Sequence, residues 1–455
     1  MLRALPGKHL KHLVSLLGGV FLAQWVFGPD WVHSLISSSV TYLICALAPR
    51  KYCPLIAFVW VMGYMTGAHV YRMYVSYLSG VFDFTGTQMV LTMKLTSFAY
   101  NLYDGTADRK NVFPVVPHED KRKAKVYGER SKFAIERLPG PLEFFGYVYC
   151  FTCLLAGPAF EYNDYVRAID GSAFQRSTAK DAEKDNKHPA RAQAPASVLP
   201  ALSRLTVGVV CLVGHLVLGG KFPISNLYTP TWVAQHANHA VRFLFLYGAL
   251  FAERLKYYFA WKVAEGASVL AGFGFQGYDK DGHEVGWRGV ENIEILGFET
   301  ATNVQTLSRV WNKRTQGWLE RYTYQRSGRS LLLTYFISAF WHGLYPGFFV
   351  FFMSVPLMTN IERLVKAKIN PMVVPGYDGY NLETYPKGAV ATAYWGVSWV
   401  LTTVFMSYVV QAFSMSSWER CATALGSYHY VPYGFCVAAY VVLELWPAQK
   451  NTKKQ

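Results

Sequence analysis

The sequence predicts an all-α polytopic membrane protein, and three observations carry that prediction. Of the 455 residues, 52% are hydrophobic and only 16% are charged, whereas about a quarter of the residues in a soluble domain are charged. Apolar runs long enough to cross a bilayer recur along the chain, bounded by charged residues or by Pro and Gly. The chain is also rich in Trp, Tyr and Phe, which gather at membrane interfaces.

The apolar runs predict roughly ten or eleven crossings in a single membrane-embedded domain. Because several runs are short or interrupted by glycine, we expect re-entrant and interfacial helices among them, around a buried catalytic chamber. The predicted segments are residues 13–27, 31–48, 54–72, 79–102, 141–158, 200–219, 240–262, 331–353, 386–412 and 429–447, within a domain of residues 1–455.

Polar stretches separate some of these segments. Residues 104–137 form a basic-leaning loop, and residues 161–199 contain almost no large apolar side chains, so we predict a mobile, solvated loop there. Residues 448–455 form a basic tail. The net charge of +15 lies in short loops and at both ends, which favours cytosolic termini and contact with anionic lipids. Nucleic-acid binding would need a basic patch on a soluble module, and the sequence predicts none.

The ends and the cysteines add two further predictions. Arg3, Lys8 and Lys11 precede the first apolar run, but no small-residue cleavage site follows it, so we predict an uncleaved membrane segment. Cys150 and Cys153 form a C-x-x-C inside an apolar run. With no second pair nearby, they are interpreted as small buried hydrophobes rather than metal ligands.

The segment at residues 331–353 carries a histidine in an otherwise uncharged run. It reads LLLTYFISAFWHGLYPGFFVFFM, with His342 as its ionisable group. A titratable side chain at membrane depth is costly unless it faces protein or a water-filled cavity, so His342 is a candidate functional residue. The alternative is a half-buried histidine that hydrogen-bonds to a neighbouring helix.

The region at residues 264–329 breaks the spanning pattern. It begins with a glycine-rich stretch at residues 265–277, and it ends with residues 310–322, VWNKRTQGWLERY. Val310, Trp311, Trp318 and Tyr322 fit one face of an amphipathic interfacial helix. Asn312 lies in this piece, and by itself an asparagine is more often a helix-surface or capping residue than a catalytic one.

The sequence segments around these two residues resemble those of the membrane-bound O-acyltransferase family. WHGLYPGFFVFF and VWNKRTQGWLERYTYQR resemble its two signature segments, and further segments resemble its lysophospholipid (lysophosphatidylcholine-type) acyltransferase branch, most of all the plant and fungal type. Those further segments are MVLTMKLTSFAYNLYDG (89–105), LPGPLEFFGYVYC (138–150), LLAGPAFEYNDY (154–165) and WKVAEGASVLAGFGFQGYD (261–279).

The resemblance implies an enzyme of phospholipid remodelling that moves an acyl group from acyl-CoA to the free hydroxyl of a lysophospholipid. It implies His342 and Asn312 as catalytic residues, no permanently bound cofactor or metal, and a place in the endoplasmic reticulum membrane. The candidate substrate-binding residues are Trp311, Lys313, Arg314, Trp341, Gly343, Tyr345 and Glu265. Lys313 stands where the family commonly has a branched apolar residue, and Gln316-Gly317 replaces a more usual pair.

The chemistry explains why such an enzyme needs these groups. A thioester is already activated, so the remaining task is to accept the hydroxyl proton, which suits an imidazole with an ordinary pKa near ~6.5. The amide of Asn312 can orient the imidazole or donate to the developing oxyanion. Basic side chains near the cytosolic mouth would bind the coenzyme A phosphates, or alternatively anchor the chain at the membrane: Lys313, Arg314, Arg321, Arg326 and Arg329.

Charged residues elsewhere in the apolar segments have structural interpretations. Lys94, Asp104 and Glu143 are expected to pair within the bundle, because buried charges need partners. Glu265 either anchors the glycine-rich segment or faces the substrate cavity. Two other functions stay open: acylation of diacylglycerol or a protein, and transport of a solute, although the hydropathy pattern shows no internal repeat.

Overall fold

The computed structural model describes residues 2–80, 83–106, 120–175, 195–375, 377 and 387–447. Within these ranges the chain is helical and no β-strand occurs, only an isolated antiparallel bridge between Tyr278 and Glu284. The chain forms two compact units that interleave along the sequence. Unit 1 comprises Met1–Cys211, Tyr258–Asn292 and Gly317–Gly328, and unit 2 comprises Leu212–Tyr257, Ile293–Gln316 and Arg329–Gln455.

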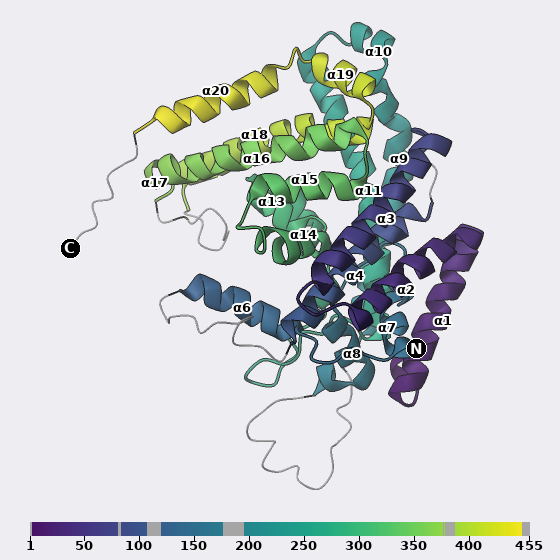
Figure 1. The fold of residues 1–455 in the computed structure, drawn as a ribbon. Helices are drawn as coiled ribbons and strands as arrows, with labels where there is room; N and C mark the ends of the chain where they lie inside the picture. The colour runs from purple at the N-terminus through teal and green to yellow at the C-terminus, as the bar shows by residue number, and fades with distance from the viewer. Residues whose placement is uncertain are drawn as a thin grey trace, which may run out of the picture. The chain divides into compact units, whose positions relative to one another are not determined.

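The first half of the chain supplies most helices of unit 1. They are α1 (Lys8–Phe27), α2 (Val32–Leu47), α3 (Cys53–Val75), α4 (Thr85–Asp104), α6 (Lys121–Phe133), α7 (Pro141–Val148) and α8 (Tyr162–Asp170). Helix α3 packs along α2 and α4, and α1 packs along α7 (Figure 1). Two long helices, α9 (Val198–Lys221) and α11 (His239–Ala271), each contain residues of both units, because the sequence passes from one unit to the other at residues 211–212 and 257–258.

Unit 2 is organised around α16 (Pro346–Lys368). Helices α15 (Leu331–His342), α18 (Ala389–Met415) and α20 (Val431–Leu445) pack on it, and α19 (Trp418–Gly426) packs on α18 (Figure 1). Short helices complete the unit: α10 (Pro230–Gln235), α12 (Ile295–Glu299), α13 (Val304–Val310) and α17 (Asn370–Val373). Helix α14 (Lys313–Leu319) continues into a π-helical turn at Glu320–Tyr324.

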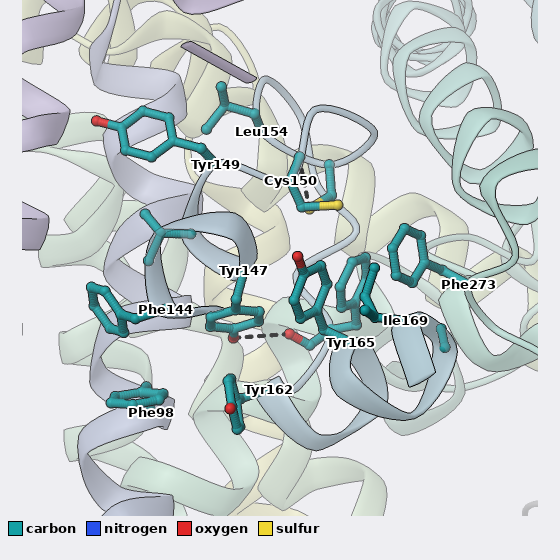
Figure 2. Close-up of a cluster of buried hydrophobic side chains, with 14 of the residues drawn as sticks. Phe98, Phe144, Tyr147, Tyr149, Cys150, Leu154, Tyr162, Tyr165, Ile169 and Phe273 are labelled. Atoms are coloured by element: carbon teal, nitrogen blue, oxygen red, sulfur yellow. Dashed lines mark hydrogen bonds between the residues drawn. The ribbon is translucent and has the colours of Figure 1, made fainter. Parts of the chain in front are cut away.

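Unit 1 is held together by a cluster of buried aromatic side chains (Figure 2). Phe98 of α4 meets Phe144 of α7 edge to face at 5.0 Å, and Tyr165 of α8 stacks on Phe273 at 5.8 Å. The Tyr147 hydroxyl donates a 3.1 Å hydrogen bond to the Phe160 carbonyl, so its polar atom is satisfied inside the cluster. Because these rings come from segments far apart in the sequence, they fix the fold of the unit.

Many large apolar side chains point outward instead of inward. Trp25, Leu47, Leu199 and Leu216 are each more than two-thirds exposed, and they lie on the largely apolar helices α1, α2 and α9. Among the described residues, five helical stretches are long and apolar enough to cross a membrane: Lys8–Leu47, Cys53–Val75, Val198–Lys221, Pro346–Val373 and Ala389–Met415. The protein is therefore an all-α polytopic membrane protein, as the sequence predicts, while the number of crossings and the buried chamber stay predictions.

The predicted segment at 141–158 is not one helix. Helix α7 ends at Val148, and turns follow up to Gly157, whose φ is +81°. The end of α7 is held by Lys94, whose Nζ donates to the carbonyls of Tyr147 (2.5 Å) and Val148 (3.1 Å). A helix leaves its last carbonyls without intrahelical partners, and this buried ammonium satisfies two of them.

Two predicted loops contain helices. Within residues 104–137, helix α6 begins after Asp120, whose carboxylate accepts from the Lys123 amide and caps it. Within residues 161–199, helix α8 buries Tyr165 and Ile169 in the core of unit 1. A nine-residue amphipathic helix is too short to stand out in a composition dominated by polar residues. The rest of that loop from residue 176 to 194, and the tail at 448–455, lie outside the described residues.

The buried charges of unit 1 have partners, as predicted. Asp104 binds Arg130 at 2.6 Å and Arg326 at 2.5 Å, while Glu143 accepts from the Tyr162 hydroxyl. All seven cysteines are buried free thiols, which confirms the prediction for Cys150 and Cys153.

Candidate active site

His342 is the last residue of α15, not the middle of a continuous spanning helix. The predicted helix at 331–353 divides here, because Gly343 has φ +129° and ψ −177°, a conformation essentially confined to glycine. Helix α16 starts three residues later, with Pro346 in its first turn. The histidine therefore stands at a helix end, where its side chain is half-buried.

A hydrogen bond fixes the protonation pattern of the imidazole. His342 Nδ1 lies 2.7 Å from the carbonyl oxygen of Ser338, one turn earlier in α15. A carbonyl oxygen can only accept, so Nδ1 carries the proton. In the neutral ring Nε2 then holds the lone pair, which is the state that a general base needs.

Aromatic rings surround this imidazole within unit 2. The ring centroids of Trp341, Phe352 and Phe413 lie 4.6, 4.8 and 5.2 Å from that of His342. Trp341 and Phe413 present their edges to it or receive its edge, at interplanar angles of 85° and 88°. Packing on several sides restricts the rotation of the ring, so the hydrogen bond and the rings together hold the imidazole in one orientation.

A close contact between α16 and α18 brings these rings together. A methyl group at Gly347 would lie 2.1 Å from the Ala412 carbonyl oxygen, and the Gly347 amide donates to Ser416 at 2.7 Å. Only glycine permits this approach. As a result Phe348, one residue further along α16, stacks on Phe413 of α18 at 4.6 Å beside the histidine.

Asn312 lies in a break between two helices of unit 2. Helix α13 ends at Val310 and α14 begins at Lys313, so the predicted amphipathic helix at 310–322 is wrong in its first turn. The break has a backbone cause: Asn312 has φ +42°, in the left-handed region. Asparagine tolerates this region better than most residues. Its carbonyl accepts from the Gln316 amide at 3.0 Å and so starts α14.

The neighbours of Asn312 are anchored on both sides. The Trp311 ring packs against Phe298 at 4.8 Å and Tyr257 at 6.0 Å. Lys313 Nζ binds Glu294 Oε1 at 2.5 Å. The predicted role of Lys313 in binding coenzyme A stays a prediction, but in this structure its ammonium is engaged by a carboxylate.

The other predicted binding residues occupy different surroundings. Trp341 and Gly343 are buried beside His342, and Tyr345 precedes α16 with its ring 5.6 Å from that of Phe348. Arg314 is half-buried on α14. Their contact with a substrate stays a prediction.

Glu265 has the anchoring contacts that the sequence allows for it. It is fully buried on α11, its Oε2 lies 2.7 Å from Lys262 Nζ and 3.7 Å from Arg204 Nε, and its Oε1 accepts from the Asn292 amide at 2.7 Å. These bonds tie the start of the glycine-rich segment to Asn292, within unit 1.

Two other predicted basic residues are engaged in unit 1. Arg321 binds Glu161 at 2.8 Å, and Arg326 binds Asp104. Both arginines therefore have structural partners of opposite charge. Sequence reasoning missed Glu161, which also accepts from Asn101 at 2.8 Å and from the Tyr322 hydroxyl at 3.0 Å.

Sequence reasoning also missed Ser338, Phe413 and Glu294. Ser338 could have been found, because a residue four positions before a helix-terminal histidine offers its carbonyl to that side chain. Nothing in the sequence places Phe413 beside His342 or Glu294 beside Lys313, because both contacts depend on tertiary packing.

One group of described residues could hold a metal ion. Asp279, Asp281 and His283 are exposed, and their ligand atoms lie within 4.8 Å of one another. Hydrogen bonds from the amides of Asp281 (2.9 Å) and His283 (2.8 Å) to Asp279 already account for this arrangement, and they lower the pKa of the Asp279 carboxyl. No part of the candidate site involves these residues.

The fold and the site together define a polytopic helical membrane protein with an oriented histidine beside an apolar helix junction. Residues 70–411 match the model of the membrane-bound O-acyltransferase family. The chain therefore belongs to this family, and both His342 and Asn312 lie inside the matched range.

Several curated proteins are similar over nearly the whole chain. Membrane-bound glycerophospholipid O-acyltransferase 2 of Mus musculus is 30% identical, and the match covers 98% of this chain and 80% of the mouse protein. Lysophospholipid acyltransferase 1 of Arabidopsis thaliana is 29% identical, with 99% and 92% covered. Lysophospholipid acyltransferase of Schizosaccharomyces pombe is 29% identical, with 91% and 77% covered. These identities do not single out the plant and fungal type.

Proposed function

We propose that this protein is an acyl-CoA-dependent O-acyltransferase that esterifies the free hydroxyl of a lysophospholipid. Family membership supports acyl transfer, and the names of the mouse, plant and yeast relatives support a glycerophospholipid acceptor. Among the lysophospholipids, lysophosphatidylcholine is the acceptor that we propose the enzyme prefers. The reaction belongs to phospholipid remodelling in the endoplasmic reticulum membrane, and it needs acyl-CoA as co-substrate without a permanently bound cofactor.

The observation that carries the mechanism is the bond from His342 Nδ1 to the Ser338 carbonyl. It leaves Nε2 as the acceptor for the proton of the lysolipid hydroxyl. As the proton moves to Nε2, the hydroxyl oxygen attacks the thioester carbonyl, and the carbonyl oxygen takes negative charge. Collapse of this intermediate breaks the carbon–sulfur bond, and the thiolate recovers the proton from His342 as coenzyme A departs. The products are a diacyl phospholipid and free coenzyme A.

Asn312 supplies the second polar group in this proposal. Its side-chain amide donates to the oxyanion or orients a substrate, and removal of one such donor costs about 10²–10³-fold in other acyl transfers. The apolar rings around His342 keep water from the thioester, which would otherwise hydrolyse.

An acyl-transfer assay on membranes tests the proposal. Microsomes from cells that lack endogenous lysophospholipid acyltransferases would receive labelled acyl-CoA with lysophosphatidylcholine, other lysophospholipids or diacylglycerol. We expect labelled diacyl phospholipid, with lysophosphatidylcholine as the preferred acceptor. Transfer to diacylglycerol alone, or no transfer from acyl-CoA to any acceptor, would contradict the proposed function.

A further inference from the structure

Glu294 holds the residues on both sides of Asn312. Its backbone amide donates to the Val310 carbonyl at 3.2 Å, two residues before Asn312. Its carboxylate binds Lys313 Nζ at 2.5 Å, one residue after Asn312. Both bonds lie within unit 2 and close the segment from Glu294 to Lys313 into a loop.

The conformation of Asn312 explains why such a closure matters. Its backbone is left-handed, and a non-glycine residue keeps that conformation only where its surroundings determine it. The residue before it, Trp311, is packed against Phe298. The residue after it, Lys313, is held by an ion pair with Glu294, and the two side chains are only 28% and 32% exposed.

The rest of the loop is anchored independently of Glu294. Arg254 makes a two-pronged ion pair with Glu299 at the end of α12, at 2.9 and 2.8 Å. At the start of α13, Glu362 accepts from the Gln305 amide at 3.0 Å. These contacts keep the loop folded, so a change at Glu294 acts on the short stretch that contains Asn312.

From this arrangement we infer that Glu294 is a positioning residue for the acyl-transfer reaction, and that its ion pair with Lys313 fixes Asn312. The inference rests on the proposed function and adds to it a residue that touches no substrate. It assigns Lys313 to Glu294 instead of to the phosphates of coenzyme A. The two assignments predict different kinetics.

Charge reversal separates them. Glu294→Lys and Lys313→Glu each place like charges side by side, and we expect kcat to fall about tenfold or more in each. In the double variant the pair forms again with its charges exchanged, and we expect kcat within about threefold of the wild type. The KM for acyl-CoA should stay within about twofold throughout, because uniform substrate binding is unchanged.

The pair Glu253–Lys256 on α11 provides the matched control. It is also a partly exposed ion pair of unit 2, with side chains 27% and 43% exposed. Glu253→Lys should leave kcat unchanged. Thermal unfolding of each purified variant in detergent shows whether the protein folds. If a charge-reversed variant does not fold, the milder substitutions Glu294→Gln and Lys313→Met replace it in the kinetic comparison.

Three outcomes would overturn the inference. They are an unchanged kcat in both single variants, a double variant no better than the worse single one, or a raised KM for acyl-CoA in Lys313→Glu alone. Absence of lysophospholipid acylation by the wild type is a different result, since it contradicts the proposed function and not the ion pair. The variants would then be compared on the acceptor that the wild type uses.

Discussion

Two explanations compete for why residue 312 is an asparagine, Asn312, and three substitutions at this position distinguish them. An asparagine is favoured at φ +42° for backbone reasons alone, and it is also the second predicted catalytic residue. Glycine adopts the left-handed region freely and has no amide side chain. Alanine lacks the amide and is strained there, by about 1–2 kcal/mol. Aspartate keeps the shape but has no N–H to donate.

If the amide acts in catalysis, all three variants should lose about 10²–10³-fold in kcat, equivalent to roughly 3–4 kcal/mol of transition-state stabilisation. Their stabilities should differ, however. Asn312→Ala should lose about 1–2 kcal/mol in the free energy of unfolding, whereas Asn312→Gly should stay within about 1 kcal/mol of the wild type. The measurements are initial rates of acyl transfer in detergent–lipid micelles and thermal unfolding of the same preparations.

Asn303 is the control for this series. It also lies in unit 2, and its side chain caps α13 by accepting from the Thr306 amide at 2.7 Å. Asn303→Ala should cost about 1 kcal/mol of stability with kcat nearly unchanged. If Asn312→Gly retained near-wild-type kcat, the amide would have no catalytic role, and Asn312 would be present for its backbone conformation only.

Three other predictions follow from described contacts. His342→Ala should reduce acyl transfer at least about 10²-fold while the protein still inserts and folds; near-normal activity would make His342 a structural residue. Gly347→Ala should place a methyl group against the Ala412 carbonyl, costing about 1–3 kcal/mol and lowering kcat through the displaced rings; an unchanged unfolding midpoint would contradict this close approach. Asp104→Asn should leave two half-buried arginines without their buried counter-ion, for a loss of about 3 kcal/mol in the free energy of unfolding; a loss below about 0.5 kcal/mol would show that this pairing is not stabilising.

Several features of this protein follow from its sequence, and the reasons are local. Hydrophobic length and flanking charges are properties of a single segment, so the helices at 13–27, 54–72, 200–219 and 386–412 are found close to their structural positions, as α1, α3, α9 and α18. Helix ends that depend on a distant partner are not found. Helix α7 stops where Lys94 satisfies its carbonyls, and Lys94 lies about fifty residues away in the sequence.

The candidate site also combines features that the local sequence predicts with features that it does not. His342 and Asn312 are identified from the sequence segments around them, but their backbone and side-chain conformations are not. The break at Gly343 could have been anticipated from the Gly and Pro residues that follow His342. The left-handed backbone at Asn312 and the ring of Phe413 could not, because each depends on packing between segments that are not neighbours in the sequence.

The acceptor that orients His342 is a main-chain oxygen, and this has a consequence for how the site can vary. Every amino acid at position 338 presents the same carbonyl, so no substitution at that position deletes the acceptor of the hydrogen bond from Nδ1. In enzymes where a carboxylate side chain holds the histidine, one base change can remove that partner. In this protein a mutation of Ser338 leaves the tautomer of His342 unchanged. Which residues position 338 accepts is limited only by the space around its small, buried side chain.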